Sequence, residues 1–157
     1  MERSEQLAHR FEADSALRTL VLVGERWTLL ILREAFFGVR RYGQLARNLG
    51  IPRPTLSNRL AKLVDAGVME RSRYLDQPER YEYRLTDPGR DLFSTIVTLM
   101  QWGDRNLAGP EGPPIVLRHD DCGRIADPRL TCGHCGEEVH ARNVTPEPGP
   151  AFRARAA

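Results

Sequence analysis

The residues with the clearest chemical potential lie in the last third of the chain. His119 and Cys122 are separated by two residues, Cys132 and Cys135 have the same separation, and a glycine follows each pair. Three thiolates and one imidazole at this spacing are suited to a closed tetrahedral zinc site. Because a closed site leaves no position for a substrate, the sequence predicts zinc as a structural cofactor held by these four residues.

Two such pairs resemble the two knuckles of a zinc ribbon, and a segment of about 30 residues needs the metal because it cannot bury much core. The fourth ligand stays open, since His140, Asp120 and Asp121 all compete with the histidine of the first pair. His134 lies inside a knuckle and is expected to point away. A thioredoxin-like redox pair is the other interpretation of Cys-x-x-Cys, but the residues after Cys135 offer no good helix for it.

No other feature of the sequence points to catalysis or to a membrane. An open-ligand zinc motif, a phosphate-cradling glycine loop and a nucleophile–base pair are all missing, so the chain is not expected to be an enzyme. No run approaches about 18 apolar residues, and the charged N-terminus lacks the apolar centre of an export signal. Three cysteines without such a signal argue against a disulfide framework. The expected location is the cytoplasm.

The basic residues are unevenly distributed. Residues 40–84 contain ten basic and five acidic side chains, whereas the whole chain has a net charge of only +2. This segment is therefore net positive and the remainder net negative. A local positive field favours a polyanionic partner.

The same segment has the pattern of a helix-turn-helix. A short helix ends at Gly50, Pro52 and Pro54 indicate a turn and a helix start, and leucines then recur at helical spacing up to Gly67. The second helix of such a motif enters the major groove of duplex DNA. Its outer face, together with the preceding arginine pair, supplies the predicted DNA-binding residues: Arg40, Arg41, Arg53, Thr55, Ser57, Asn58, Arg59 and Lys62. Replacing Arg59 by Ala is predicted to weaken DNA binding without unfolding the protein.

Two alternating stretches, VMERSRYL and YEYRLT, follow this helix and predict a β-hairpin, which is the wing of a winged helix. Arginines in the hairpin can contact flanking phosphates or a minor groove, or they can pair with the acidic residues beside them. Arg73 and Arg80 are the two that we expect to contact DNA.

The remaining elements complete a mainly α fold with one small β-hairpin. Helices are expected over residues 15–23 and 27–38, and a last helix over about 86–106 is too apolar for burial on one side, which favours a homodimer. The predicted domains are a winged helix-turn-helix domain for DNA binding and dimerisation (1–108), a linker (109–114), a zinc-ribbon-like segment (115–145) and a disordered tail (146–157).

The stretches GERWTLLILREAFFGVRRYGQLARNLG and YEYRLTDPGRDL resemble the HxlR-type family of winged-helix regulators, which is related to the MarR type. The resemblance covers about residues 14–105. It implies a dimeric DNA-binding repressor or activator whose first and last helices form the dimer interface. Many family members carry a cysteine where this chain has Asp14, so a thiol switch is not expected at that position.

The function expected from the sequence is therefore transcriptional regulation, with repression favoured, by a homodimer bound to a pseudo-palindromic operator in double-stranded DNA. A zinc-responsive regulator and a winged-helix module that binds proteins are the alternatives. A small-molecule effector is compatible with the sequence, but no residue identifies one.

Overall fold

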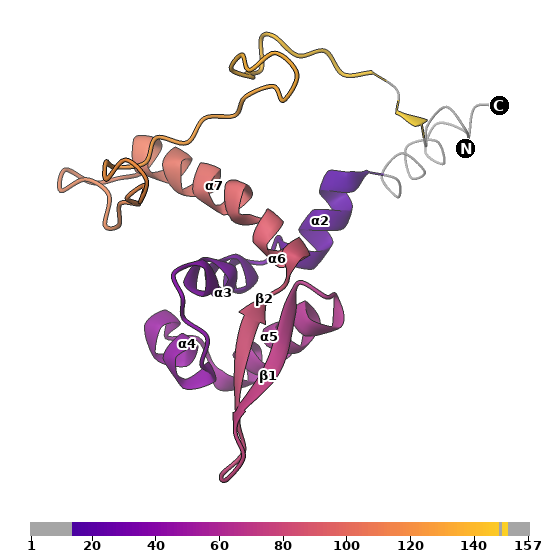
Figure 1. Cartoon of the computed structure of the whole chain (residues 1–157), viewed down its shortest axis with the longest axis vertical. Coiled ribbons are helices and arrows are strands. Elements are labelled where there is room, and N and C mark those ends of the chain that lie inside the picture. The colour runs from indigo at the N-terminus through magenta and orange to yellow at the C-terminus, as the bar shows by residue number, and fades with distance from the viewer. Residues whose placement is uncertain (1–13, 148, 151–157) are drawn as a thin grey trace. The chain divides into compact units, whose positions relative to one another are not determined.

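The computed structural model describes residues 14–147 and 149–150. These form two compact units that divide between Ile96 and Val97. The elements, in chain order, are α2 (Ser15–Val23), α3 (Arg26–Phe36), α4 (Tyr42–Leu49), α5 (Arg53–Asp65), β1 (Met69–Leu75), β2 (Arg80–Leu85), α6 (Asp87–Asp91) and α7 (Phe93–Asn106) (Figure 1). The expected architecture of helices with one hairpin is confirmed. Much of the predicted disordered tail lies outside the described residues.

An aliphatic core holds the first unit together. Helix α5 contributes Leu56, Leu60 and Leu63, which recur at helical spacing and are fully buried on one face. Four apolar side chains of the neighbouring elements are also fully buried: Ile31, Leu32, Leu45 and Met69. Each such side chain stabilises the fold by roughly 1.5–3 kcal/mol.

The first described helix begins at the position where the family resemblance had suggested a cysteine. The Asp14 carboxylate accepts hydrogen bonds from the backbone N–H groups of Ala16 and Leu17, at 2.8 and 3.0 Å. It therefore caps the N-terminus of α2, which cysteine would do poorly.

Helices α4 and α5 form the predicted helix-turn-helix. Gly50 ends α4 in the left-handed conformation, with φ of 60°. Ile51 then buries its side chain, and α5 begins at Arg53 with Pro54 in its first turn. Proline is well tolerated there because its missing N–H has no partner within the helix.

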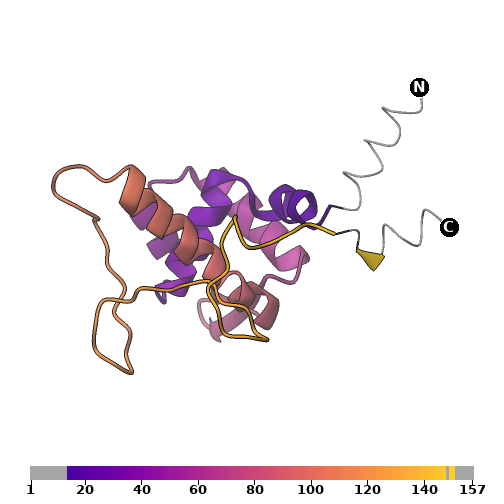
Figure 2. The same ribbon diagram turned by 90° about the horizontal axis from the view of Figure 1, so that it is seen from above.

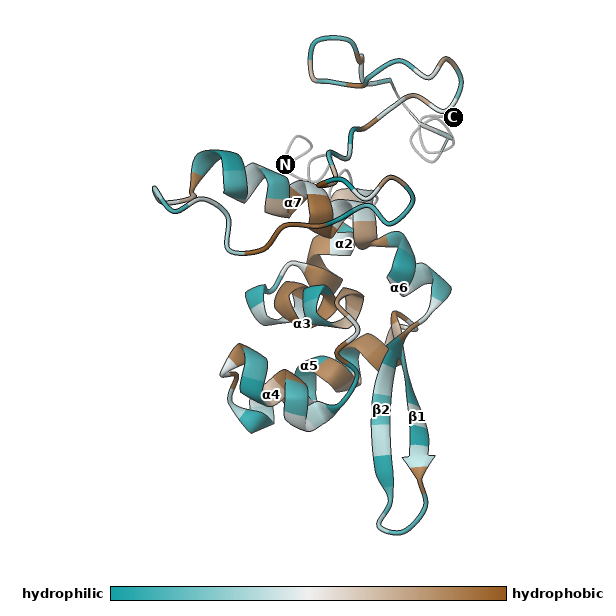
Figure 3. Ribbon diagram, turned by 60° about the vertical axis from the view of Figure 1, so that its left-hand side comes forward, coloured by the Kyte–Doolittle hydropathy of each residue, from teal (hydrophilic) through white to brown (hydrophobic). Residues whose placement is uncertain are grey.

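The hairpin that follows is antiparallel, and it is tied to the chain segment before α4. Arg71 pairs with Tyr83 and Met69 with Leu85 across β1 and β2. Arg41 forms an isolated bridge with Glu82, and the N–H of Tyr83 donates to the Arg40 carbonyl at 2.8 Å. Figure 3 shows mostly hydrophilic residues along both strands.

The prediction of a single last helix over about residues 86–106 is wrong in one respect: the described chain has two helices there, α6 and α7. Helix α6 begins at its cap Thr86, whose hydroxyl accepts from the N–H of Gly89 and donates to the Gly67 carbonyl. The N–H of Leu92 bonds to the Gly89 carbonyl three residues earlier, which makes a tighter turn between α6 and α7.

The second unit contains most of α7 and the chain that follows it. Figures 1 and 2 show this following segment as loops. Two isolated antiparallel bridges, Arg118 with Ile125 and Thr131 with Glu138, close two short turns within it. In the described part of the chain, no helix combines the length and the apolar character needed to cross a membrane.

Candidate nucleic-acid interface

The outward face of α5 lies opposite its buried leucines. Asn58 lies near the middle of α5, Lys62 in its last turn, and Arg53 and Ser57 toward its beginning; all four are exposed. Thr55 is half-buried at the edge. Four of the six α5 residues that the sequence predicted for DNA contact are therefore exposed to solvent.

Tyr42, which the sequence analysis missed, holds the first turn of α5 in place. Its hydroxyl donates to the carbonyl of Arg53 at 2.9 Å and lies 3.1 Å from the hydroxyl oxygen of Ser57. The tyrosine is the first residue of α4, so this contact joins the two helices of the motif. Its signal in the sequence was only an aromatic residue next to the arginine pair.

Arg59 takes a different place from the one expected. Its guanidinium donates to the carboxylate of Glu25, the residue before α3, at 2.7 Å, and only 22% of the side chain is exposed. On the circumference of α5, Arg59 lies one turn from Leu56 and Leu63, near the buried edge. Arg59 thus joins α5 to α3, and we do not include it in the DNA-contacting set below.

A buried carboxylate connects α3 to α4. Glu34 is only 7% exposed, and its two oxygens accept hydrogen bonds from Asn48 at 2.7 Å and from Arg33 at 3.0 Å. A buried charge without such partners would be strongly destabilising. The contact therefore fixes the position of α4, and with it the helix-turn-helix, on the central helix.

The arginine pair before α4 is exposed on the same unit. The Arg41 guanidinium lies over the ring of Tyr74 in the hairpin, 4.8 Å from the ring centre. Arg40 forms no side-chain hydrogen bond or ion pair with the described residues. Both backbones join the hairpin, so the two side chains are carried by a defined strand-like segment.

Most of the hairpin arginines are already paired within the hairpin. Arg73 forms ion pairs with Asp76 at 3.0 Å and Glu79 at 3.1 Å, and Arg84 pairs with Glu82 at 2.5 Å. Arg71 lies over the ring of Tyr81 at 3.6 Å. Within the part of the chain that the structure describes, Arg80 is the hairpin arginine without such a contact, so it is the better of the two predicted wing residues.

The excess positive charge of residues 40–84 is confined to the first part of that segment. Residues 40–64 contain six basic side chains and no acidic one, while residues 65–84 contain four basic and five acidic ones. The helix-turn-helix therefore carries the excess positive charge, and the hairpin is nearly neutral.

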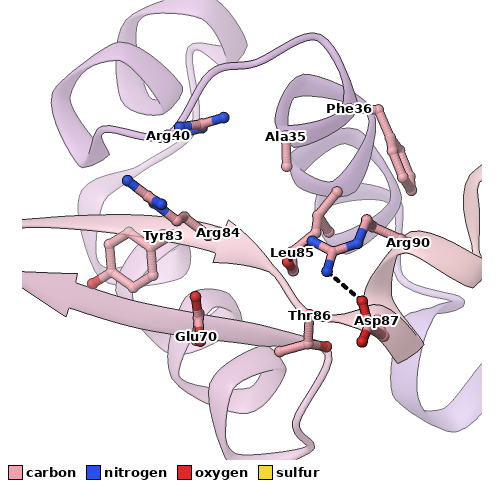
Figure 4. Close-up of a pocket in the computed structure, with 10 residues that line it drawn as sticks. All are labelled: Ala35, Phe36, Arg40, Glu70, Tyr83, Arg84, Leu85, Thr86, Asp87 and Arg90. Atoms are coloured by element: carbon pink, nitrogen blue, oxygen red, sulfur yellow. Dashed lines mark hydrogen bonds and ion pairs between the residues drawn. The ribbon is translucent and has the colours of Figure 1, made fainter.

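An open pocket of about 560 Å³ lies in the first unit between α3, β2 and α6. Figure 4 shows Arg40 and Arg84 on one side of it, with Phe36 and Arg90 on the other. Arg84 is paired with Glu82 and Arg90 with Asp87, so most of the cationic lining is neutralised.

Apolar side chains remain exposed on two helices. On α2, Leu20 and Val21 are 61% and 81% exposed. On α7, Leu99 and Trp102 are each 52% exposed. Exposed aliphatic and aromatic side chains at successive helical positions are typical of an interface with another chain.

The four predicted metal ligands lie in the two short turns of the second unit. The Nδ1 atom of His119 is 3.4 Å from Sγ of Cys122. Hydrogen bonds from the backbone N–H groups of Cys135 and His134, and from the Cys135 side chain, lower the pKa of the Cys132 thiol. Among the described residues, no three His, Cys, Asp or Glu side chains come close enough together to hold one metal ion.

Comparison with known proteins shows that most of the chain is similar to helix-turn-helix transcriptional regulators. The family model of the HxlR-like helix-turn-helix matches residues 22–110. An uncharacterised HTH-type transcriptional regulator of Mycobacterium tuberculosis, Rv3095, is 71% identical over 151 residues, which cover 96% of each chain.

Solved structures agree with this sequence similarity. The transcription-factor candidate PA1607 superimposes with a TM-score of 0.78 at 31% identity, over 89% of this chain and 98% of that one. PA1374 of Pseudomonas aeruginosa, another transcription-factor candidate, superimposes with a TM-score of 0.63 at 34% identity, over 88% and 97% of the two chains.

Proposed function

The chain belongs to the HxlR-like helix-turn-helix family, and from this premise we propose that it represses transcription as a homodimer that binds a pseudo-palindromic operator through α5. The coarser assignment, a transcriptional regulator of the helix-turn-helix type, follows from the family and from relatives such as Rv3095.

One observation carries the proposal: the outward face of α5 is polar, basic and accessible, while its inner face is fixed in the core. Lys62 and Arg53 supply cations for phosphates, and Asn58 supplies an amide that can bond the edge of an adenine. Residues 40–64 contain no acidic side chain, and Asp65, the last residue of α5, is the one carboxylate of the helix-turn-helix. Arg40, Arg41 and Arg80 extend the positive surface beyond the helix.

A homodimer would present two copies of α5 to one face of the duplex. In helix-turn-helix dimers the two recognition helices enter successive major grooves about 34–36 Å apart, and the operator repeats the two-fold symmetry of the protein. The exposed apolar residues of α2 and α7 support association of two chains. A dimer that covers two adjacent grooves excludes polymerase from them, which favours repression.

Selection of bound duplexes from a random pool, followed by fluorescence anisotropy on the selected sequence, tests the proposal. Lys62→Ala should weaken binding to all duplexes and reduce the slope of log affinity against log salt by about one. Asn58→Ala should cost about 1–3 kcal/mol on the selected sequence and relax the preference at one base pair.

Arg142→Ala is the matched control, since it removes one exposed positive charge outside α2, α5 and α7. It should leave both the affinity and the salt slope unchanged. If no sequence is enriched from the pool, the chain is not a sequence-specific DNA-binding protein. If Arg142→Ala and Lys62→Ala have equal effects, α5 is not the DNA-reading element.

A further inference from the structure

The second unit contains a repeat in which each residue of the first turn has a counterpart thirteen positions later. Residues 117–126 read LRHDDCGRIA, and residues 130–139 read LTCGHCGEEV. In this alignment His119 corresponds to Cys132 and Cys122 to Cys135, with Gly123 and Gly136 directly after them. The sequence similarity of the two turns is therefore concentrated at the positions that can bind a metal.

The backbone hydrogen bonds follow the same repeat. The N–H of Gly123 donates to the His119 carbonyl at 2.8 Å, and the N–H of Gly136 donates to the Cys132 carbonyl at 2.8 Å. The N–H groups of His119 and Cys132 donate to the carbonyls five residues later, at 2.9 and 2.8 Å. Each turn thus folds its two candidate ligands back toward each other in the same way.

Both turns also require glycine at the same place. Gly123 has φ of 67° and Gly136 has φ of 76°, so each occupies the left-handed region that other residues rarely adopt. The glycine closes the turn immediately after the second candidate ligand. Two unrelated surface loops would not be expected to share ligand spacing, hydrogen bonds and glycine geometry.

We propose that these two turns are the halves of one zinc site, with His119, Cys122, Cys132 and Cys135 as its ligands. In a tetrahedral zinc site, bond lengths of about 2.1 Å to nitrogen and 2.3 Å to sulfur separate the two ligand atoms by about 3.5 Å. The distance between Nδ1 of His119 and Sγ of Cys122 is 3.4 Å. These two atoms therefore lie at about the separation of two ligands of one zinc ion, whereas the four proposed ligands are not yet gathered among the described residues.

Neighbouring groups support the ligands in the manner of metal sites. The other ring nitrogen of His119, Nε2, faces the carboxylate of Asp121 at 3.5 Å, and such a partner orients a metal-binding histidine.

The repeat also selects the fourth ligand. His134 corresponds to Asp121, which lies between the two ligand positions, and His140 falls after the repeat has ended. The Nδ1 atom of His140 accepts a hydrogen bond from the N–H of Arg142 at 3.3 Å, which occupies one of its two ring nitrogens. Only His119 stands in the position equivalent to a cysteine of the second turn.

Nine residues connect Cys122 to Cys132. This connection has to bring the two turns together before all four ligands can bind one ion. A connection of this length adds little entropy cost to closure. It is anchored to α7, because the side-chain amide of Gln101 donates to the Pro128 carbonyl at 3.1 Å. We therefore expect metal binding and ordering of the segment to occur together, as in other small zinc modules.

Cobalt(II) titration of the full chain, stripped of metal by a chelator and kept reduced, tests the site. We expect one Co²⁺ per chain, with the intense visible bands of tetrahedral cobalt and a thiolate charge-transfer band, both abolished by an equivalent of Zn²⁺. Hydrogen exchange should show new protection over residues 115–140 when Zn²⁺ is added. Weak octahedral spectra or the absence of saturable binding would overturn the proposal.

Variants separate the proposed ligand from its neighbours. His119→Ala should weaken binding by more than roughly 100-fold, since loss of an outer partner alone costs roughly 10–100-fold. His134→Ala is the matched control and should keep the affinity of the unsubstituted chain. If His140→Ala, rather than His119→Ala, abolishes binding, the proposed ligand set is wrong. The readout is metal affinity, so the result is independent of whether the chain binds DNA.

Discussion

At the scale of single residues, partners that are distant in the sequence decide what a side chain can do. Arg59 and Lys62 lie one turn apart on α5 and both are basic. The first is held by Glu25 and the second faces solvent. We therefore assign a structural role to Arg59 and a DNA-contacting role to Lys62.

Replacing Arg59 by Ala should lower the free energy of unfolding by about 1 kcal/mol, because the ion pair with Glu25 is partly exposed. DNA affinity should change less than it does in Lys62→Ala. Urea unfolding and fluorescence anisotropy measure the two effects. Glu25→Gln should destabilise the protein to a similar extent, and the double variant should be little worse than either single one. If Arg59→Ala reduces DNA affinity and leaves stability unchanged, Arg59 is a DNA-contacting residue, as the sequence predicted.

Gly89 shows how closely two backbones approach at the end of the hairpin. An added Cβ would lie 2.1 Å from the Val68 carbonyl oxygen, which belongs to the backbone and cannot move aside easily. Gly89→Ala should therefore destabilise the protein by about 1–3 kcal/mol, despite the better helix propensity of alanine. Denaturant unfolding is the measurement. Gly43→Ala in α4, where the nearest atom is 3.7 Å away on a flexible arginine, should be neutral or stabilising.

At the scale of elements, two polar contacts determine how the reading helix is presented. Glu34 of α3 binds Asn48 of α4, and Tyr42 of α4 binds the first turn of α5. The buried carboxylate of Glu34 therefore fixes the helix-turn-helix to α3. The hydroxyl of Tyr42 joins the two helices of the motif, α4 and α5. The glutamate contact lies away from the outward face of α5, whereas the tyrosine hydroxyl also reaches the hydroxyl of Ser57 on that face.

Tyr42→Phe should lower stability by about 0.5–1.5 kcal/mol and also weaken operator binding, because the first turn of α5 loses its hydroxyl anchor. Thermal unfolding and anisotropy on the same samples check both effects. Tyr74→Phe is the control, since that ring lies exposed on the hairpin and its contact with Arg41 uses the ring face. Equal behaviour of the two variants would show that the Tyr42 hydroxyl has no positioning role.

At the scale of the whole molecule, the exposed apolar residues of α2 and α7 require a partner, and the proposed partner is a second copy of the chain. Val21, the most exposed of those on α2, contributes apolar surface that a monomer would leave in water. The proposed dimer would also raise DNA affinity, because each chain alone presents one copy of α5.

Val21→Asp should convert a dimer of 17.8 kDa chains into a monomer and weaken operator binding steeply, since a buried unpaired carboxylate is costly. Sedimentation equilibrium gives the mass. Leu75→Asp near the end of the hairpin, where the leucine is 41% exposed, should leave the dimer intact. A monomeric unsubstituted chain, or a Val21→Asp variant that stays dimeric, would remove α2 from the interface.

What the sequence alone could predict was local. The helix-turn-helix followed from Leu56, Leu60 and Leu63 at helical spacing after Pro52 and Pro54, and the hairpin followed from alternation, because both periods are properties of neighbouring residues. The repeated ligand spacing near the C-terminus was likewise visible without coordinates.

The tertiary structure alone decided the contacts between distant residues. The pairing of Arg59 with Glu25, the burial of Glu34 against Asn48 and the Tyr42 hydroxyl bond each join different elements, and the break before α7 accompanies the close approach of Gly89 to Val68. Periodicity predicts which face of a helix is buried, but it does not predict which side chain of a neighbouring element contacts that face. The sequence therefore identified α5, which we propose as the reading helix, whereas the three-dimensional packing determined which of its cations face solvent.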